Sequence, residues 1–189
     1  HDRHQVGEKW VSRDPLKGSG RSMREGRLLE KYVERFGDDW VEMREGGEGE
    51  VRMKPLAEYR HLVEETGRFL LITGEEVTTT WGDVDDWSQT HWINVFNTPE
   101  VVRPQHDPIS SSRAMQATFD EARSMAESGA EILAFLNHPN CGWNATAEDI
   151  AAVAGLRHIE IYTALNMCAT LGDELHCAVE RIWDVALAL

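Results

Sequence analysis

Basic residues are scarce in this chain, and lysine is the scarcer of the two kinds. Lysine and arginine together number 19 against 33 aspartates and glutamates, so the formal charge at neutral pH is −14. The only lysines are Lys9, Lys17, Lys31 and Lys54. A chain this acidic lacks the broad positive surface that holds nucleic-acid phosphates, which disfavours DNA or RNA binding through a basic face.

Long apolar runs and metal-type cysteine spacings are missing as well. No apolar run is long enough to cross a bilayer, so the sequence predicts no membrane span. The three cysteines, Cys141, Cys168 and Cys177, are an odd number without a C-x-x-C pair. This pattern disfavours a disulfide framework and a structural zinc knuckle, and it predicts buried thiols.

The two ends of the sequence lack the usual features of domain ends. The first residue is His1 rather than methionine, and the last residues, 182–189, are an apolar stretch without a polar tail. We therefore expect a fragment of a longer protein. Its localisation stays open between cytoplasmic and exported, and its oligomeric state also stays open.

The residues that are present suffice for a folded domain. Of the 189 residues, 41% are hydrophobic and 28% are charged, which predicts a single globular domain over residues 1–189. Apolar periodicity predicts helices at 19–36, 55–66, 112–128, 146–153 and 173–189. It predicts strands at 69–72, 76–80, 91–96, 131–136 and 157–162, and a β-hairpin insertion at about 38–54. Alternating strands and helices favour an α/β layer or barrel.

Polar side chains beside these strands are the first candidates for a site. Glu76, His91 and His138 lie at or near strand ends, and Glu160 lies within the last strand. Because such ends gather at one edge of an α/β barrel, a carboxylate and two imidazoles are expected to converge on a metal-bearing cleft. A capping or surface histidine is the plainer interpretation of His91. Glu75 is an alternative to Glu76 as the carboxylate of the site.

These segments resemble, in order and spacing, motifs of the PHP (polymerase and histidinol phosphatase) superfamily. The similar motifs are a "G-x-E" strand, an "H-x-N" strand, an "HPN" turn, an "iEvyN" strand, a "WD" helix and the tail of "TDH", at 71–78, 91–95, 136–140, 159–162, 182–184 and 1–4. The "H-x-H" pair of the family's first strand and the "D-x-H" pair of its last strand are not found at those places, and Thr163 stands where the family usually has Asn. These departures agree with the interpretation as a fragment.

The resemblance implies a distorted (β/α)7 TIM-like barrel, incomplete as given, with metal ions at the ends of its strands. It implies two or three zinc, manganese or iron ions in the complete domain. Carried over by position, the metal ligands of this chain would be His1, Glu76, His91 and His138.

The activity implied is that of a phosphoesterase acting on a small-molecule phosphate ester through a metal-bridged hydroxide. His176 is the expected proton donor to the leaving oxygen, although an exposed helix histidine is its plainer interpretation. Asn140 and Arg113 are expected to touch the substrate. Two alternatives stay open: a metal-dependent hydrolase of a non-phosphate bond, and a catalytically inactive PHP-like binding domain.

Overall fold

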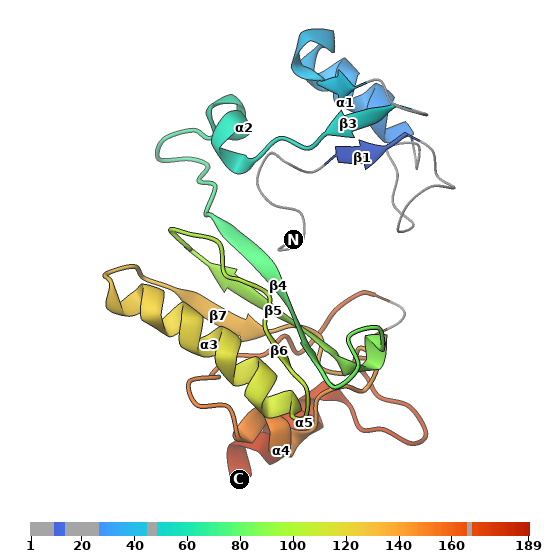
Figure 1. Cartoon of the computed structure of the whole chain (residues 1–189), viewed down its shortest axis with the longest axis vertical. Helices are drawn as coiled ribbons and strands as arrows, with labels where there is room; N and C mark the ends of the chain where they lie inside the picture. The colour runs from blue at the N-terminus through green and yellow to red at the C-terminus, as the bar shows by residue number, and fades with distance from the viewer. Residues whose placement is uncertain (1–9, 14–26, 45–48, 166–167) are drawn as a thin grey trace. The chain divides into compact units, whose positions relative to one another are not determined.

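The computed structural model describes residues 10–13, 27–44, 49–165 and 168–189. The chain divides into two compact units, His4–Leu71 and Ile72–Leu189, which are coloured blue to green and green to red in Figure 1. That they belong to one domain over residues 1–189 stays a prediction. No helix in the described ranges is long and apolar enough to cross a membrane.

The first unit is built around a small antiparallel sheet. Its strands are β1 (Trp10–Ser12), β2 (Met43–Arg44) and β3 (Glu50–Arg52), in the order β1-β3-β2. Its helices are α1 (Leu28–Phe36), the short 3-10 helix η3 (Asp38–Trp40) and α2 (Leu56–Val63). Strands β2 and β3 pair antiparallel within the range 38–54 where a hairpin is expected, and its being an insertion stays a prediction.

The second unit contains a four-stranded sheet in the order β6-β4-β5-β7. The strands are β4 (Gly74–Trp81), β5 (Thr90–Phe96), β6 (His106–Asp107) and β7 (Leu133–Leu136). The helices are η4 (Trp87–Gln89), α3 (Ser111–Glu127), α4 (Ala147–Ala151) and α5 (Val179–Ala188). Helix α3 crosses one face of the sheet, as Figure 1 shows.

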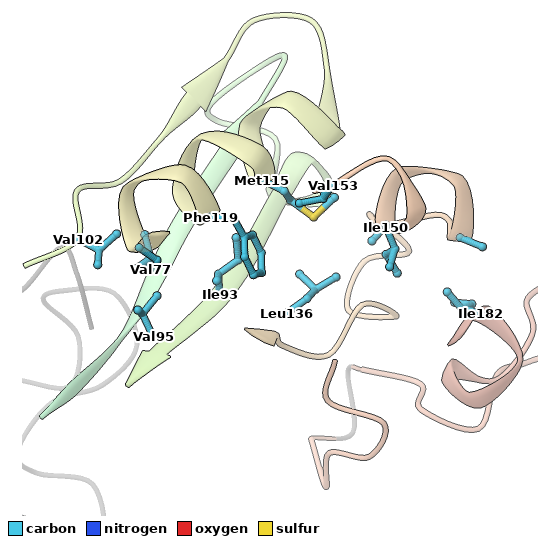
Figure 2. Close-up of a cluster of buried hydrophobic side chains, with 13 residues drawn as sticks. Val77, Ile93, Val95, Val102, Met115, Phe119, Leu136, Ile150, Val153 and Ile182 are labelled. Atoms are coloured by element: carbon cyan, nitrogen blue, oxygen red, sulfur yellow. The ribbon is translucent and has the colours of Figure 1, made fainter. Parts of the chain in front are cut away.

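The core of this unit lies between α3 and the sheet. Met115 and Phe119 of α3 are buried against Val77, Ile93 and Val95 of the two central strands, and these side chains point toward one another in Figure 2. Burial of each large apolar side chain stabilises the fold by about 1.5–3 kcal/mol. The sheet therefore has one face closed by a helix, and the residues of that face are fixed by strand alternation.

The prediction of a TIM-like barrel is wrong. Strand β4 pairs antiparallel with β5, and β5 pairs antiparallel with β7, whereas a barrel of this type needs parallel neighbours. Parallel strands require a crossover of a dozen or more residues, and the connection 82–89 between β4 and β5 is too short to provide one. The described fold is a mixed α/β arrangement with an open sheet.

Two of the expected strands are not strands in the structure. Phe69, Leu70 and Ile72 of the run 69–72 are exposed, and the segment makes a single isolated bridge from Glu65 to Phe69. The segment 157–162 likewise makes one isolated bridge, between Ile159 and Leu136. A short run of strand-forming residues does not specify a pairing partner, and a segment that pairs at one bridge only forms no strand.

Helix positions agree better with the sequence. Thr146 caps α4 and forms a reciprocal pair with Asp149, as expected for a capping box. Helix α5 begins at Val179 rather than at residue 173, because Asp173 accepts backbone hydrogen bonds from Leu175 and His176 in a turn. Helix α1 begins at Leu28, and residues 19–26 of the predicted helix lie outside the described residues.

Candidate metal site on the open face of the sheet

The two faces of the β4–β5 ladder carry different chemistry. Glu76 pairs directly with Asn94, and Thr79 pairs directly with His91. Directly paired residues share a face, and residues an odd number of positions apart on one strand point to opposite faces. Glu76 and Asn94 therefore lie on the face opposite α3, while Thr79 and His91 lie on the α3 face.

A hydrogen-bonded chain of polar groups runs across the face of the sheet opposite α3, which we call the open face. The amide nitrogen of Asn94 donates to the Asn137 side-chain oxygen at 2.7 Å. The Asn137 amide nitrogen in turn donates to Glu76 Oε1 at 2.8 Å. Asn137 is buried, follows β7 directly and continues its ladder through a backbone bond to Trp92. The carboxylate of Glu76 is thereby held in a fixed orientation by the side chain that directly follows β7.

His138 lies beside this carboxylate. Its Nε2 is 3.7 Å from Glu76 Oε1, and its side chain is 11% exposed. Its backbone N–H donates to Glu160 Oε2 at 2.9 Å, and its φ of 21° lies outside the regions that most side chains adopt. Glu160 therefore holds the turn in which the imidazole is presented, and strained backbone of this kind is often found at functional sites.

An aromatic wall borders the His138 ring. The Trp92 and His138 ring centroids are 5.2 Å apart, and the tilted Trp87 ring lies next to Trp92 at 5.5 Å. Gly142 has a φ of 72°, and a Cβ at this position would lie 2.8 Å from the Trp87 ring. The turn after His138 therefore needs glycine at this position for the wall to close. Apolar rings beside an imidazole and a carboxylate reduce the local access of water.

Together, Glu76 and His138 make half of a metal-binding set. Two ligands of a tetrahedral zinc ion with bonds of about 2.0–2.2 Å have donor atoms about 3.3–3.6 Å apart. The observed 3.7 Å is close to this separation, and a carboxylate oxygen and an imidazole nitrogen are both common zinc ligands. The two residues therefore fit a divalent ion, with Asn137 and Glu160 orienting them from outside.

The structure does not bring His91 to this pair. The His91 side chain is buried on the α3 face, where Nε2 lies 2.9 Å from the hydroxyl of Ser111 at the start of α3. Burial lowers the pKa of His91 to about 4, against a smaller opposing effect of Asp149. His91 is thus a neutral, buried histidine that ties β5 to α3.

The other predicted site residues make contacts of their own. Arg113 is exposed on α3 and pairs with Asp107 at 3.0 Å. His176 stacks on Trp143 with ring centroids 3.9 Å apart, and its Nδ1 lies 2.8 Å from Asp173 Oδ1. Asn140 and His176 both line a cavity of about 350 Å³. His1 lies outside the described residues.

The Asn140 side chain donates hydrogen bonds to backbone carbonyl groups. Its side chain is buried, and its amide nitrogen donates to the carbonyl oxygens of Ala169 and Cys177 at 2.9 and 3.2 Å. These bonds tie the turn after β7 to the loop that precedes α5. Whether Asn140 also touches a substrate stays a prediction.

The expectation of three buried thiols is wrong. Cys141 and Cys168 form a disulfide, and Cys177 is a free, exposed thiol. Their separation of 27 residues and the odd cysteine count gave no sign of this pairing. The pairing of Cys141 with Cys168 depends on a tertiary contact between the turn after β7 and the loop that holds Cys168, which no local sequence pattern indicates.

Sequence patterns also gave little weight to three other residues of this face. Asn94 and Trp92 lie within the predicted strand 91–96 on either side of Ile93, and the strand turns them to the other face of the sheet from Ile93. Asn137 lies in the segment 136–140 that resembles the "HPN" turn, and its side chain holds Glu76. No known protein family, curated protein or solved structure matches this chain.

Proposed function

We propose that the chain belongs to a metal-dependent hydrolase of phosphate esters, with Glu76 and His138 as ligands of a divalent ion. The observation that carries this proposal is the 3.7 Å approach of Glu76 Oε1 and His138 Nε2 on the open face of the sheet. The resemblance of residues 71–78, 91–95 and 136–140 to PHP motifs gives the reaction class. This reaction class is supported by the positions of Glu76, Asn94 and His138. These residues come one from each of the three segments and lie together on the open face of the sheet.

The electrostatics of the unit favour a cation. Residues 72–189 hold five arginines, no lysine and eighteen carboxylates, a formal charge of −13. A negative field raises the local concentration of divalent cations and disfavours phosphate esters. A bound ion reverses the sign of the charge that the substrate meets at the site.

A bound divalent ion supplies charge that lowers the pKa of a water molecule and neutralises phosphoryl oxygens. The residues of this chain prepare the site for it. Asn137 fixes the Glu76 oxygen that faces His138, and Glu160 fixes the backbone of His138. Trp92 shields the imidazole from solvent. The roles of His176, Asn140 and Arg113 stay predictions.

Metal binding is the first test of the proposal. The oxidised chain is loaded with Mn²⁺ or Zn²⁺, and binding is followed by calorimetry and by elemental analysis after gel filtration. His138→Ala and Glu76→Gln should each weaken binding by at least about tenfold, since each removes a direct ligand. His158→Ala, which alters an exposed histidine of the same unit, is the control and should bind as the wild type does.

Activity is the second test. The loaded chain is assayed against a panel of aryl and alkyl phosphate esters, and against carboxylic esters and amides as the non-phosphate set. Turnover of phosphate esters that is lost in His138→Ala supports the proposal. Turnover confined to the non-phosphate set would move the site to the alternative hydrolase class.

One observation favours the non-catalytic alternative. Among the described residues, only Glu76 and His138 of the predicted ligands come together, because His91 lies on the other face. Metal binding without turnover of any ester in the panel would identify a binding domain. A wild-type chain that retains no metal would overturn both interpretations.

A further inference from the structure

A second group of metal-type ligands lies at the same turn. One ligand atom from each of His138, Cys141 and Cys168 falls within 4.8 Å of the other two. Both cysteines are buried, and His138 is nearly so. In the oxidised chain the two sulfur atoms are bonded to each other.

Local backbone structure explains how two of the three ligands meet. His138 and Cys141 are three residues apart in a turn that is closed by a hydrogen bond from Cys141 N–H to the His138 carbonyl at 2.8 Å. Such a turn places its first and last side chains on the same side. The pair therefore needs no contribution from the disulfide to remain together.

The loop that carries Cys168 is held in the same way. Asn140 donates to the Ala169 carbonyl at 2.9 Å, and the Thr170 hydroxyl bonds the carbonyl of Thr163 at 3.3 Å. Val179 N–H donates to the Thr170 carbonyl at 3.0 Å and ties the loop to the start of α5. None of these contacts includes the sulfur–sulfur bond, so we expect them to keep Cys168 near Cys141 in the reduced chain.

His138 also has an unused ring nitrogen. Its Nδ1 is buried and has no hydrogen-bond partner among the described residues. A buried polar atom without a partner costs about 1–3 kcal/mol, and coordination of a metal ion removes that cost. Imidazole nitrogen and two thiolates are ligands that zinc prefers, and three protein ligands leave one coordination position open.

We propose that His138, Cys141 and Cys168 form a zinc site in the reduced chain, and that the Cys141–Cys168 disulfide is the metal-free form of the same site. A dithiol reductant donates two electrons and two protons, which break the sulfur–sulfur bond and leave two thiols and an oxidised dithiol. Binding of Zn²⁺ then forms two zinc–thiolate bonds and releases two protons. The redox state of the surroundings selects the form, with the disulfide persisting only under oxidising conditions.

This site goes beyond the proposed hydrolase function, although it shares His138 with it. Glu76 takes no part in the cysteine site, and Cys141 and Cys168 take no part in the proposed Glu76–His138 pair. Each proposal can therefore fail without the other.

Cobalt substitution tests the proposal. The chain is reduced with a dithiol, freed of reductant under argon and titrated with Co²⁺ in parallel with the oxidised chain. Reduced wild type should bind a single equivalent with thiolate-to-cobalt charge-transfer bands and tetrahedral d–d bands, and Zn²⁺ should displace it. The oxidised chain should show no charge-transfer band.

Variants assign the ligands. Cys168→Ser and His138→Ala should each weaken Co²⁺ binding by the reduced chain by at least about tenfold. Cys177→Ser is the matched control, since it removes the exposed thiol, and should behave as the wild type does. Glu76→Gln should also leave the charge-transfer bands intact, which separates this site from the carboxylate site.

Alkylation provides a readout that does not depend on a variant folding. In the reduced chain, Zn²⁺ should slow the modification of Cys141 and Cys168 by iodoacetamide, followed by peptide mass spectrometry, and leave that of Cys177 unchanged. Equal protection of all three cysteines, a charge-transfer band that persists in the Cys141→Ser/Cys168→Ser double variant, or no Co²⁺ binding by the reduced wild type would each overturn the proposal.

Discussion

His91 shows how burial changes the chemistry of a single side chain. The His91 side chain is 1% exposed and is hydrogen-bonded to the Ser111 hydroxyl. Burial lowers its pKa to about 4. In the unfolded chain a histidine titrates near its ordinary value of about 6.5. Between these two values the unfolded chain binds more protons than the folded chain does, so stability rises with pH over this window.

We expect His91 to make the chain sensitive to mild acid. As the pH falls from about 6.5 to about 4, the wild type should lose about 3 kcal/mol of unfolding free energy through this residue. His91→Gln keeps a polar group for Ser111 but cannot titrate, so its stability should fall less over the same range. Urea denaturation at a series of pH values measures the difference between the two curves.

His158→Gln is the control for this comparison, because His158 is exposed in the same unit. It should keep the pH dependence of the wild type. Parallel curves for the wild type and His91→Gln would contradict the assignment of the acid sensitivity to His91.

The candidate site could be predicted from the sequence only as a list of residue types. Glu76 and His138 lie at or near the ends of predicted strands, and this position together with the resemblance to PHP motifs brought them into the metal hypothesis. His91 stands in an equivalent position, but the register that pairs it with Thr79 turns its ring to the α3 face. Register depends on contacts between distant strands, so no local pattern could separate His91 from Glu76.

The contact between strand β4 and helix α3 includes a polar pair inside the core. The hydroxyl groups of Thr79 and Thr118 are 2.6 Å apart, and both residues are fully buried. The surrounding residues, such as Val77 and Met115, are apolar. A buried hydroxyl that loses its partner costs about 1–3 kcal/mol, whereas removal of both partners by groups of the same shape can be nearly neutral.

Threonine-to-valine substitutions test this pair. Thr118→Val should lower the unfolding free energy by about 1–3 kcal/mol, because the Thr79 hydroxyl then remains buried without this partner. Thr79→Val/Thr118→Val should recover most of that loss. Urea denaturation of the wild type, both single variants and the double variant gives the coupling energy directly. A double variant as unstable as the two single losses added together would contradict it.

Most helices and central strands were predictable, whereas their arrangement was not. Helix α3 and strands β4 and β5 match the expected ranges 112–128, 76–80 and 91–96 within two residues at each end. Their periodicity is a local property of the sequence. Whether β5 runs parallel or antiparallel to β4 depends on the connection 82–89, whose residues follow no periodic pattern that specifies the direction of the next strand. The barrel prediction failed at that connection.

The charge of the chain is unevenly distributed along it. Residues 72–189 carry a formal charge of −13, while the first 71 residues are close to neutral, with fourteen basic and fifteen acidic residues. The four lysines all lie before residue 55. Repulsion among like charges destabilises a compact state, and dissolved salt screens it over about 10 Å at 0.1 M ionic strength.

We expect salt to stabilise the second unit. Raising NaCl from about 0.05 to about 0.5 M shortens the screening length roughly threefold and should raise the Tm of the chain, measured by tryptophan fluorescence. Glu127→Gln/Glu131→Gln/Glu174→Gln neutralises three exposed carboxylates, one of them at the C-terminal end of α3 where the helix dipole disfavours it. This variant should have a higher Tm at low salt and a smaller response to NaCl.

Arg157→Gln removes an exposed positive charge and should change both quantities in the opposite direction. A Tm that falls with added NaCl would show that ion pairs, such as that between Arg113 and Asp107, outweigh the repulsion.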